Sequence, residues 1–154
     1  MFSTQTQSVT SNVGFLATLV ILFLSTSAFA SQKIGMVKTY QPHAYVVRLG
    51  VQQNLDIGAE IFQGDTIMTD TKGTVGIIFS DGAVLTLGPD GKLIIDKFLF
   101  NPSEQKVSFV SEVLKGTVAF ISGAIGRISP DSVQFKTPTA TLGLRGTKIL
   151  IEVK

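Results

Sequence analysis

The stretch from residue 64 to residue 96 limits the possible folds more than any other part of the chain. It contains short apolar clusters, and a turn with glycine or aspartate separates each cluster from the next. Asp81-Gly82 stands between two apolar runs, and Pro89-Asp90-Gly91 places proline where φ is preset and glycine where φ must be positive. This pattern predicts consecutive short β-strands.

The rest of the chain after residue 30 continues this pattern. Apolar and polar residues alternate from residue 131 to 136 and again from 148 to 153, and no segment keeps a helical period over an adequate length. Roughly ten short strands, spaced by about 8 to 12 residues, predict an all-β fold. The two architectures that fit are a twisted β-sandwich and a solenoid-like stack, preceded by an N-terminal signal-peptide helix.

Residues 106–121 alternate only in part. A bulge near Ser111 would restore the period, and so would a change of strand at Gly116. We therefore expect a strand pair with Gly116 at or near the turn. The alternative is a short helix over residues 111–115.

The composition excludes several classes of protein. The chain has 154 residues, of which 44% are hydrophobic and 16% charged, which is typical of an ordered domain with a core. Its 13 basic and 11 acidic residues are interspersed, with neither the basic stripe nor the aromatic platform that nucleic-acid binding needs. Because cysteine is absent, disulfides and thiolate chemistry are excluded.

The N-terminus has the features of an export signal. Residues 15–24 read FLATLVILFL and are followed by Ala28-Phe29-Ala30, which predicts cleavage before Ser31. The apolar run is shorter than the ~20 residues of a membrane span. No Lys or Arg precedes it, and an uncleaved anchor is the alternative. We expect a signal peptide over residues 1–30 and a periplasmic or secreted bacterial domain over residues 31–154.

Five aspartates recur in and around the central stretch, and such spacing beside glycine occurs in calcium sites. Calcium needs about six to eight converging oxygen ligands, whereas these aspartates are irregularly spaced. We therefore interpret Asp81 and Asp90 as turn residues that bond their own backbone, and we expect no metal and no cofactor. The five are Asp65, Asp70, Asp81, Asp90 and Asp96.

The sequence provides no catalytic constellation. His43 is the only histidine and follows a proline, far from any G-x-S-x-G motif. We therefore expect no enzyme. Without tryptophan, the phenylalanines are expected in the core rather than on a stacking surface; they include Phe62, Phe79, Phe98, Phe100, Phe109, Phe120 and Phe135.

Three blocks together resemble the FecR domain family: LDIGAEIFQGDTIMTD, VGIIFSDGAVLTLGPDGKLIID and TPTATLGLRGTKILIEV. The resemblance covers nearly all of the chain after the apolar run. The motifs GD-x-I-x-T, F-x-DG, L-x-LGP, TP-x-A and RGT occur in order. Together with Gly91 of the following turn, their key residues are Gly64, Asp65, Asp81, Gly82, Pro89, Gly91, Thr137, Pro138, Arg145, Gly146 and Thr147.

The resemblance implies an all-β, extracytoplasmic domain that contacts other proteins rather than catalysing a reaction. The founding type of the family regulates a sigma factor and carries a cytoplasmic helical segment before its membrane span, with a further domain after the β region. Here about 14 residues precede the apolar run and one residue follows Val153. We therefore expect the β module alone, without sigma-factor regulation.

Arg145 has two possible roles. It either pairs with a carboxylate such as Asp65, for which bidentate geometry is favourable, or presents its guanidinium to a partner. We expect the structural role. We also expect residues 137–147 to be the segment that closes the fold against residues 64–96.

These observations predict an exported, non-enzymatic domain that binds a protein or a cell-envelope component, in envelope signalling. Exposed strand edges offer a route, by strand addition. The alternative is a structural or carbohydrate-associated envelope module. The sequence does not name the partner, and it predicts membrane contact only through an uncleaved N-terminal segment.

Overall fold

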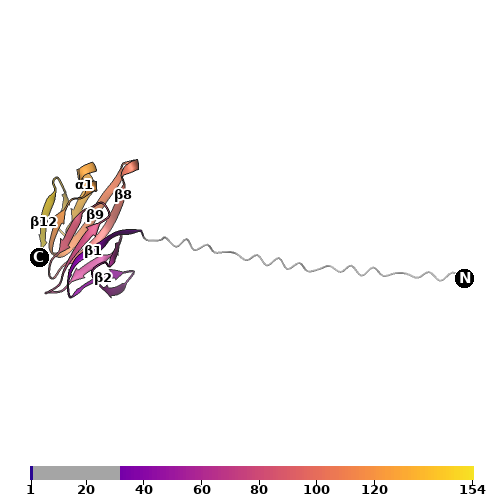
Figure 1. The fold of residues 1–154 in the computed structure, drawn as a ribbon, viewed down its shortest axis with the longest axis horizontal. Helices are drawn as coiled ribbons and strands as arrows, with labels where there is room; N and C mark the ends of the chain where they lie inside the picture. The colour runs from indigo at the N-terminus through magenta and orange to yellow at the C-terminus, as the bar shows by residue number, and fades with distance from the viewer. Residues whose placement is uncertain (2–31) are drawn as a thin grey trace.

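The computed structural model describes Met1 and residues 32–154. The predicted signal peptide lies, except for Met1, outside the described residues and stays a prediction. Within residues 32–154 no helix is long and apolar enough to cross a membrane. The described part is built from strands, as Figure 1 shows, and the all-β prediction is confirmed.

The first seven strands follow one another through short turns: β1 (Lys33–Gln41), β2 (Ala44–Arg48), β3 (Val51–Asn54), β4 (Glu60–Phe62), β5 (Thr66–Thr69), β6 (Thr74–Phe79) and β7 (Val84–Leu87). The rest of the chain contains β8 (Lys92–Asn101), β9 (Lys106–Ile121), α1 (Ala124–Ile128), β10 (Val133–Lys136), β11 (Thr141–Gly143) and β12 (Lys148–Val153). Short 3₁₀ turns at Pro102–Glu104 and Pro130–Ser132 complete it.

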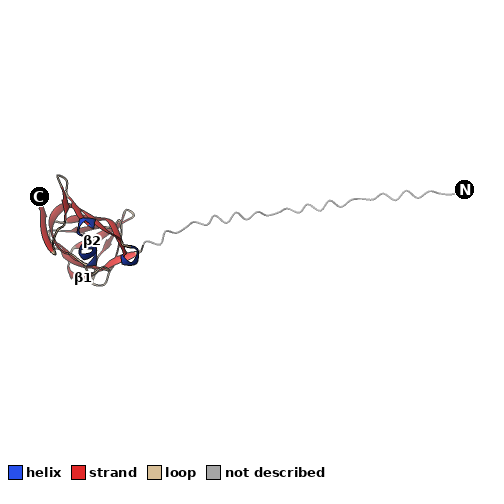
Figure 2. Ribbon diagram, turned by 90° about the horizontal axis from the view of Figure 1, so that it is seen from above, coloured by secondary structure: helices blue, strands red, loops and turns tan. Residues whose placement is uncertain are grey.

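The long strand β9 belongs to two sheets. Its N-terminal half pairs with β8 and β10, and its C-terminal half pairs with β7 and β12. One sheet has the order β3-β2-β5-β8-β9-β10-β11, and the other has the order β4-β1-β6-β7-β9-β12. All neighbours are antiparallel except β10 and β9. The strands curl around a common interior (Figure 2).

The predicted strand pair at residues 106–121 is wrong, and so is the alternative helix over residues 111–115, because β9 is continuous. The irregularity expected near Ser111 lies across from it, where the register of β8 shifts between Ile95 and Lys97. Gly116 is no turn, but its φ is 88° and a Cβ there would lie 2.6 Å from the Cα of Gly91. Any side chain at position 116 would collide with the backbone of Gly91, so β9 can continue through this position only with glycine.

Five phenylalanines form the centre of the core, as predicted. The ring of Phe109 lies 5.1 Å from Phe79 and 5.0 Å from Phe120, and Phe120 lies 4.9 Å from Phe135. Phe98 stacks on Phe79 at 5.6 Å. Because these rings come from β6, β8, β9 and β10, the cluster joins both sheets. Phe62 and Phe100 are only half-buried.

The segment between β3 and β4 bridges the two sheets on one flank of the molecule. The backbone N–H of Leu55 donates to the carbonyl of Ala44 in β2, and that of Gly58 donates to Val37 in β1. Val37 in turn donates to the carbonyl of Ala59. The segment therefore ties β2 of one sheet to β1 of the other through backbone hydrogen bonds.

Candidate functional site

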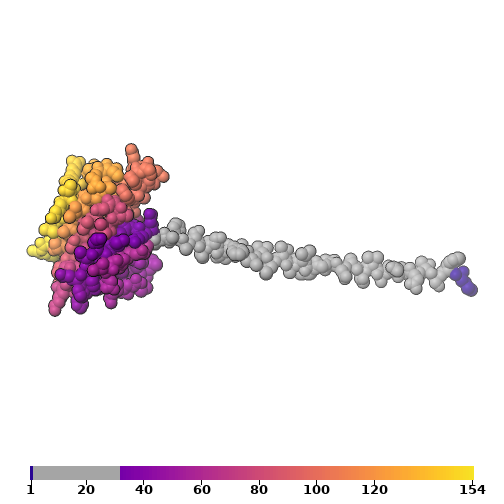
Figure 3. All heavy atoms as spheres, viewed as in Figure 1, coloured from indigo at the N-terminus to yellow at the C-terminus, as the bar shows by residue number. Residues whose placement is uncertain are grey.

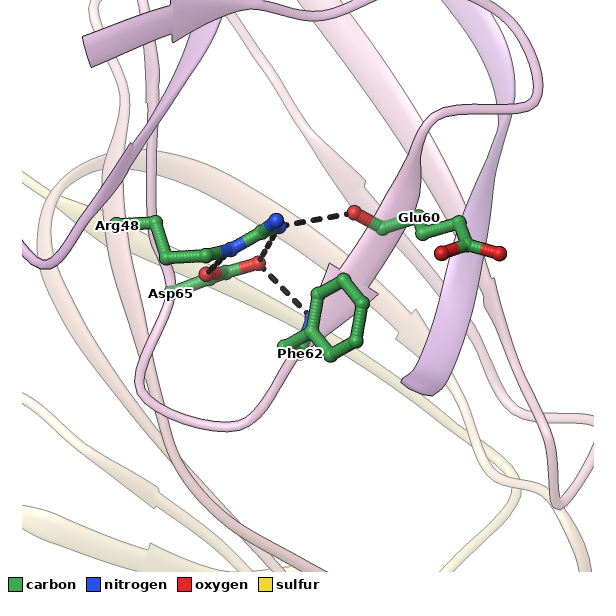
Figure 4. A network of polar contacts seen from close by, with 4 residues as sticks. All are labelled: Arg48, Glu60, Phe62 and Asp65. Atoms are coloured by element: carbon green, nitrogen blue, oxygen red, sulfur yellow. Dashed lines mark hydrogen bonds and ion pairs between the residues drawn. The ribbon is translucent and has the colours of Figure 1, made fainter. Parts of the chain in front are cut away.

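Asp65 of the GD motif is completely buried just before β5. Its carboxylate accepts two hydrogen bonds from Arg48, from Nε to Oδ1 and from Nη2 to Oδ2, both at 2.7 Å (Figure 4). Oδ2 also accepts the backbone N–H of Phe62 at 2.9 Å. Charge-assisted bidentate pairs of this kind are among the strongest polar contacts in proteins.

Arg48 connects the two sheets through the same side chain. Its Nη2 donates to the backbone carbonyl of Glu60 in β4 at 3.0 Å, and its guanidinium lies 4.3 Å from the centre of the Phe62 ring. The hydrogen bond to Asp65 raises the pKa of Arg48 above its ordinary value; burial opposes this shift, and the charges of Asp65 and Glu60 add to it. The arginine therefore stays charged and fixed.

The prediction that Arg145 pairs with Asp65 is wrong, because Arg48 occupies that carboxylate. Arg145 lies 3.6 Å from Asp131, and the two side chains are 85% and 82% exposed. A surface ion pair of this kind contributes little to stability.

Asp81 holds two segments that are distant in the sequence. Its Oδ1 accepts the N–H of Ala83 at 3.0 Å, within its own turn, and Gly82 has a φ of 82°. Its Oδ2 accepts the N–H of Ile125 at 3.2 Å, and its carbonyl accepts that of Ala124 at 2.8 Å. The aspartate thus fixes the start of α1 as well as the β6–β7 turn.

The turn that contains Pro89 and Gly91 is tied to β5. The hydroxyl of Thr69 donates to the carbonyl of Gly88 at 2.6 Å and accepts the N–H of Gly91 at 2.8 Å. Gly91 is buried, and a Cβ there would lie 2.4 Å from the side chain of Leu87. Glycine is therefore required here by a close approach. The predicted positive φ at Gly91 is wrong, because it lies at Asp90, whose φ is 51°.

The remaining three aspartates have separate local contacts. The backbone N–H of Asp90 donates to the carbonyl of Asp70 at 2.9 Å. Asp70 accepts the N–H groups of Lys72 and Gly73 at 3.0 Å each, and its other oxygen lies 3.3 Å from Nδ1 of His43. Asp96 pairs with Lys136 across the surface. Within residues 32–154 no three His, Asp or Glu side chains converge as metal ligands.

Residues 137–147 lie mostly on the surface. Thr137 and Ala140 exchange hydrogen bonds around a turn that contains Pro138. After Gly146, whose φ is 150°, the carbonyl of Thr147 accepts the N–H of Ser122. The predicted closure against the strands of residues 64–96 is wrong, because β10 and β12 pair with β9 and β11 pairs with β10.

The last strand, β12, has a free edge within the described part of the chain. It pairs with β9 on one side only. Bonding alternates along an antiparallel pair, and Ser122 bonds to Thr147, so the odd-numbered residues of β12 bond to β9. The backbone groups of Lys148, Leu150 and Glu152 therefore point to the free edge.

The side chains of β12 alternate in the same way. Ile151 is buried, with 5% exposure, whereas Leu150 is 71% exposed. On the neighbouring strand Ile121 is also exposed, at 45%. Figure 3 shows the C-terminal residues along one flank of the molecule, uncovered in this view. An exposed edge with an exposed leucine is suited to strand addition.

The described residues 32–154 form several surface grooves. A groove of about 340 Å³ on β1 and β6 is lined by residues that include Met36 and Ile78. Another, of about 300 Å³, separates the end of β12 from the turn at Pro138. Neither contains His43.

The fold and these contacts define an all-β scaffold in which aspartates, glycines and a threonine of the motifs hold turns and strand junctions. A family model described as FecR protein matches residues 65–154, which is more than half of the chain. The chain therefore belongs to the FecR family, whose members are regulatory and signalling domains. No curated protein and no solved structure matches it.

Proposed function

We propose that the chain is an exported, non-enzymatic FecR domain that binds a protein partner through the free edge of β12, in signalling at the cell envelope. The observation that carries this proposal is the edge itself. Its backbone groups at residues 148, 150 and 152 face away from β9, and Leu150 is exposed beside them. Strand addition uses such groups for affinity and the side chains between them for specificity.

The contacts of the motif residues support binding rather than catalysis. Asp65 and Asp81 accept hydrogen bonds inside the fold, and the hydroxyl of Thr69 is engaged on both sides. A nucleophile or general base must be free to reach a substrate. These polar side chains are instead committed to backbone and to Arg48.

The apolar N-terminal segment, the Ala28-Phe29-Ala30 sequence and the family of the domain support export to the periplasm. Mass spectrometry of the protein from the periplasmic fraction should find Ser31 as the first residue. Met1 on a membrane-bound protein would overturn the cleaved form.

Site-specific photocrosslinking in cells tests the proposed binding edge. A photoreactive residue at position 150 should give a protein adduct, whereas the same residue at position 142 should not. Leu142 is the matched control because it is also an exposed leucine, at 36%, on β11. No adduct at position 150 would contradict the proposal. Retention on peptidoglycan or polysaccharide without an adduct would instead favour a structural or carbohydrate-associated envelope module.

A further inference from the structure

We propose that the partner at the free edge of β12 is a second copy of this chain. The two β12 strands would run antiparallel around a twofold axis at Leu150, so that one sheet continues into the other. The inference rests on the proposed function and names the partner at the same edge.

The backbone of the edge fits this arrangement. Lys148, Leu150 and Glu152 are the residues whose N–H and C=O groups point outward. When Leu150 faces Leu150 of the second copy, Lys148 faces Glu152, and every outward residue meets another outward residue. A shift by one residue would place outward groups against residues that already bond to β9, so only shifts by two are allowed.

The side chains select one of these registers. Centred on Leu150, the pairing places Lys148 opposite Glu152 of the second copy twice, once on each side of the axis, with the two leucines in contact between them. Opposite charges and apolar pairs stabilise directly facing positions, whereas a shift by two would set Leu150 against a charged residue. The segment is therefore complementary to itself.

The charges at the edge are available for this pairing. Within residues 32–154 no ion pair involves Lys148 or Glu152, and both are exposed. Ile149 and Val153 pack on the core from the inner face of β12 but stay only partly buried. A second sheet would cover them and continue the core. A twofold interface of this kind is the commonest arrangement in homo-oligomers.

Cysteine crosslinking tests this pairing in the full chain, which has no cysteine of its own. Residues that face each other as a hydrogen-bonded pair have Cα atoms about 5.5 Å apart, within reach of a disulfide. Leu150→Cys should therefore give a disulfide-linked dimer on oxidation, and Leu142→Cys should not. Equal crosslinking of both variants, or none at position 150, would overturn the proposal.

Charge reversal in the Leu150→Cys background identifies the register. Lys148→Glu alone sets like charges opposite each other twice, as does Glu152→Lys alone, and each should lower the dimer yield about tenfold or more. Coexpression of the two single variants restores both opposite-charge pairs and should recover the dimer as a heterodimer. The double variant K148E/E152K should also recover it. Unchanged yields in the single variants would contradict the pairing.

Two controls separate the possible failures. Thermal unfolding of each variant should match that of the parent, because Lys148 and Glu152 are exposed and surface substitutions have small effects. If the photoreactive residue at position 150 captures a different protein and no second copy, the binding edge stands and self-pairing is overturned. If it captures no protein at all, both proposals fail.

Discussion

The two flanks of the molecule use their strand edges differently. On the closed flank, Arg48 joins β2 to β4 beside the buried Asp65, and the backbone bonds of the segment between β3 and β4 join β2 to β1. On the open flank, half of the backbone groups of β12 point outward, beside the exposed Leu150. The comparison separates polar groups that hold the fold from polar groups that are available to a partner.

Removing the arginine of the closed flank should have the largest effect. Arg48→Met leaves the carboxylate of Asp65 buried without its cation, which costs about 3 to 5 kcal/mol of unfolding free energy. Urea unfolding of the purified protein measures this loss. The double variant R48M/D65N should be less destabilised than R48M, because no uncompensated charge remains. A loss of less than about 1 kcal/mol for R48M would show that the Arg48–Asp65 pair does not stabilise this flank.

Removing the Asp81 carboxylate should cause the second-largest loss of stability. Asp81→Ala leaves the buried N–H groups of Ala83 and Ile125 without their acceptor, at a cost of about 2 to 3 kcal/mol. Hydrogen exchange should also accelerate at the start of α1, since its anchor is lost. Unchanged exchange there would mean that α1 is positioned by its apolar contacts alone.

A proline on the open flank should have a smaller effect. Leu150→Pro removes an N–H that faces the free edge, so the bonds to β9 remain and stability should fall by only about 1 kcal/mol. Ile151→Pro removes a bond to β9 and should unfold the strand. Circular dichroism melts compare the two variants. Equal losses would disprove the assigned alternation of β12.

The smallest effect is expected at Arg145. Its side chain is 85% exposed and lies 3.6 Å from an equally exposed carboxylate, so Arg145→Met should shift the melting temperature by less than about 2 °C. A shift as large as that of R48M would contradict this and show that Arg145 of the RGT motif stabilises the fold.

The sequence predicts features that depend on neighbouring residues. The Asp81-Gly82 turn follows from local turn chemistry, and the phenylalanine core follows from the alternation of the strands. In the turn around Gly91 the positive φ lies at Asp90 instead of the predicted glycine. Gly116 shows the limit of such reasoning, because a positive φ suits both a turn and a continuous strand that passes close to Gly91. Its role was therefore predicted wrongly.

The polar pair of the closed flank could not be found in this way. The sequence offers several basic residues that could pair with Asp65. Arg48 becomes the partner because the fold brings β2 next to β4. The family match begins at Asp65 and does not include Arg48. The free edge of β12 likewise depends on which strands lie beside β9. This is a long-range property that local sequence patterns do not contain.

Residue-resolved hydrogen exchange on β12 tests the account most directly. We compare the parent protein with Lys148→Glu at concentrations where the parent self-associates. The amide of Leu150 should be protected in the parent and exchange rapidly in the variant, while the amides of Ile149 and Ile151 stay protected in both. Rapid exchange at Leu150 in both proteins, or loss of protection at Ile149 and Ile151, would contradict the division between a closed and an open flank.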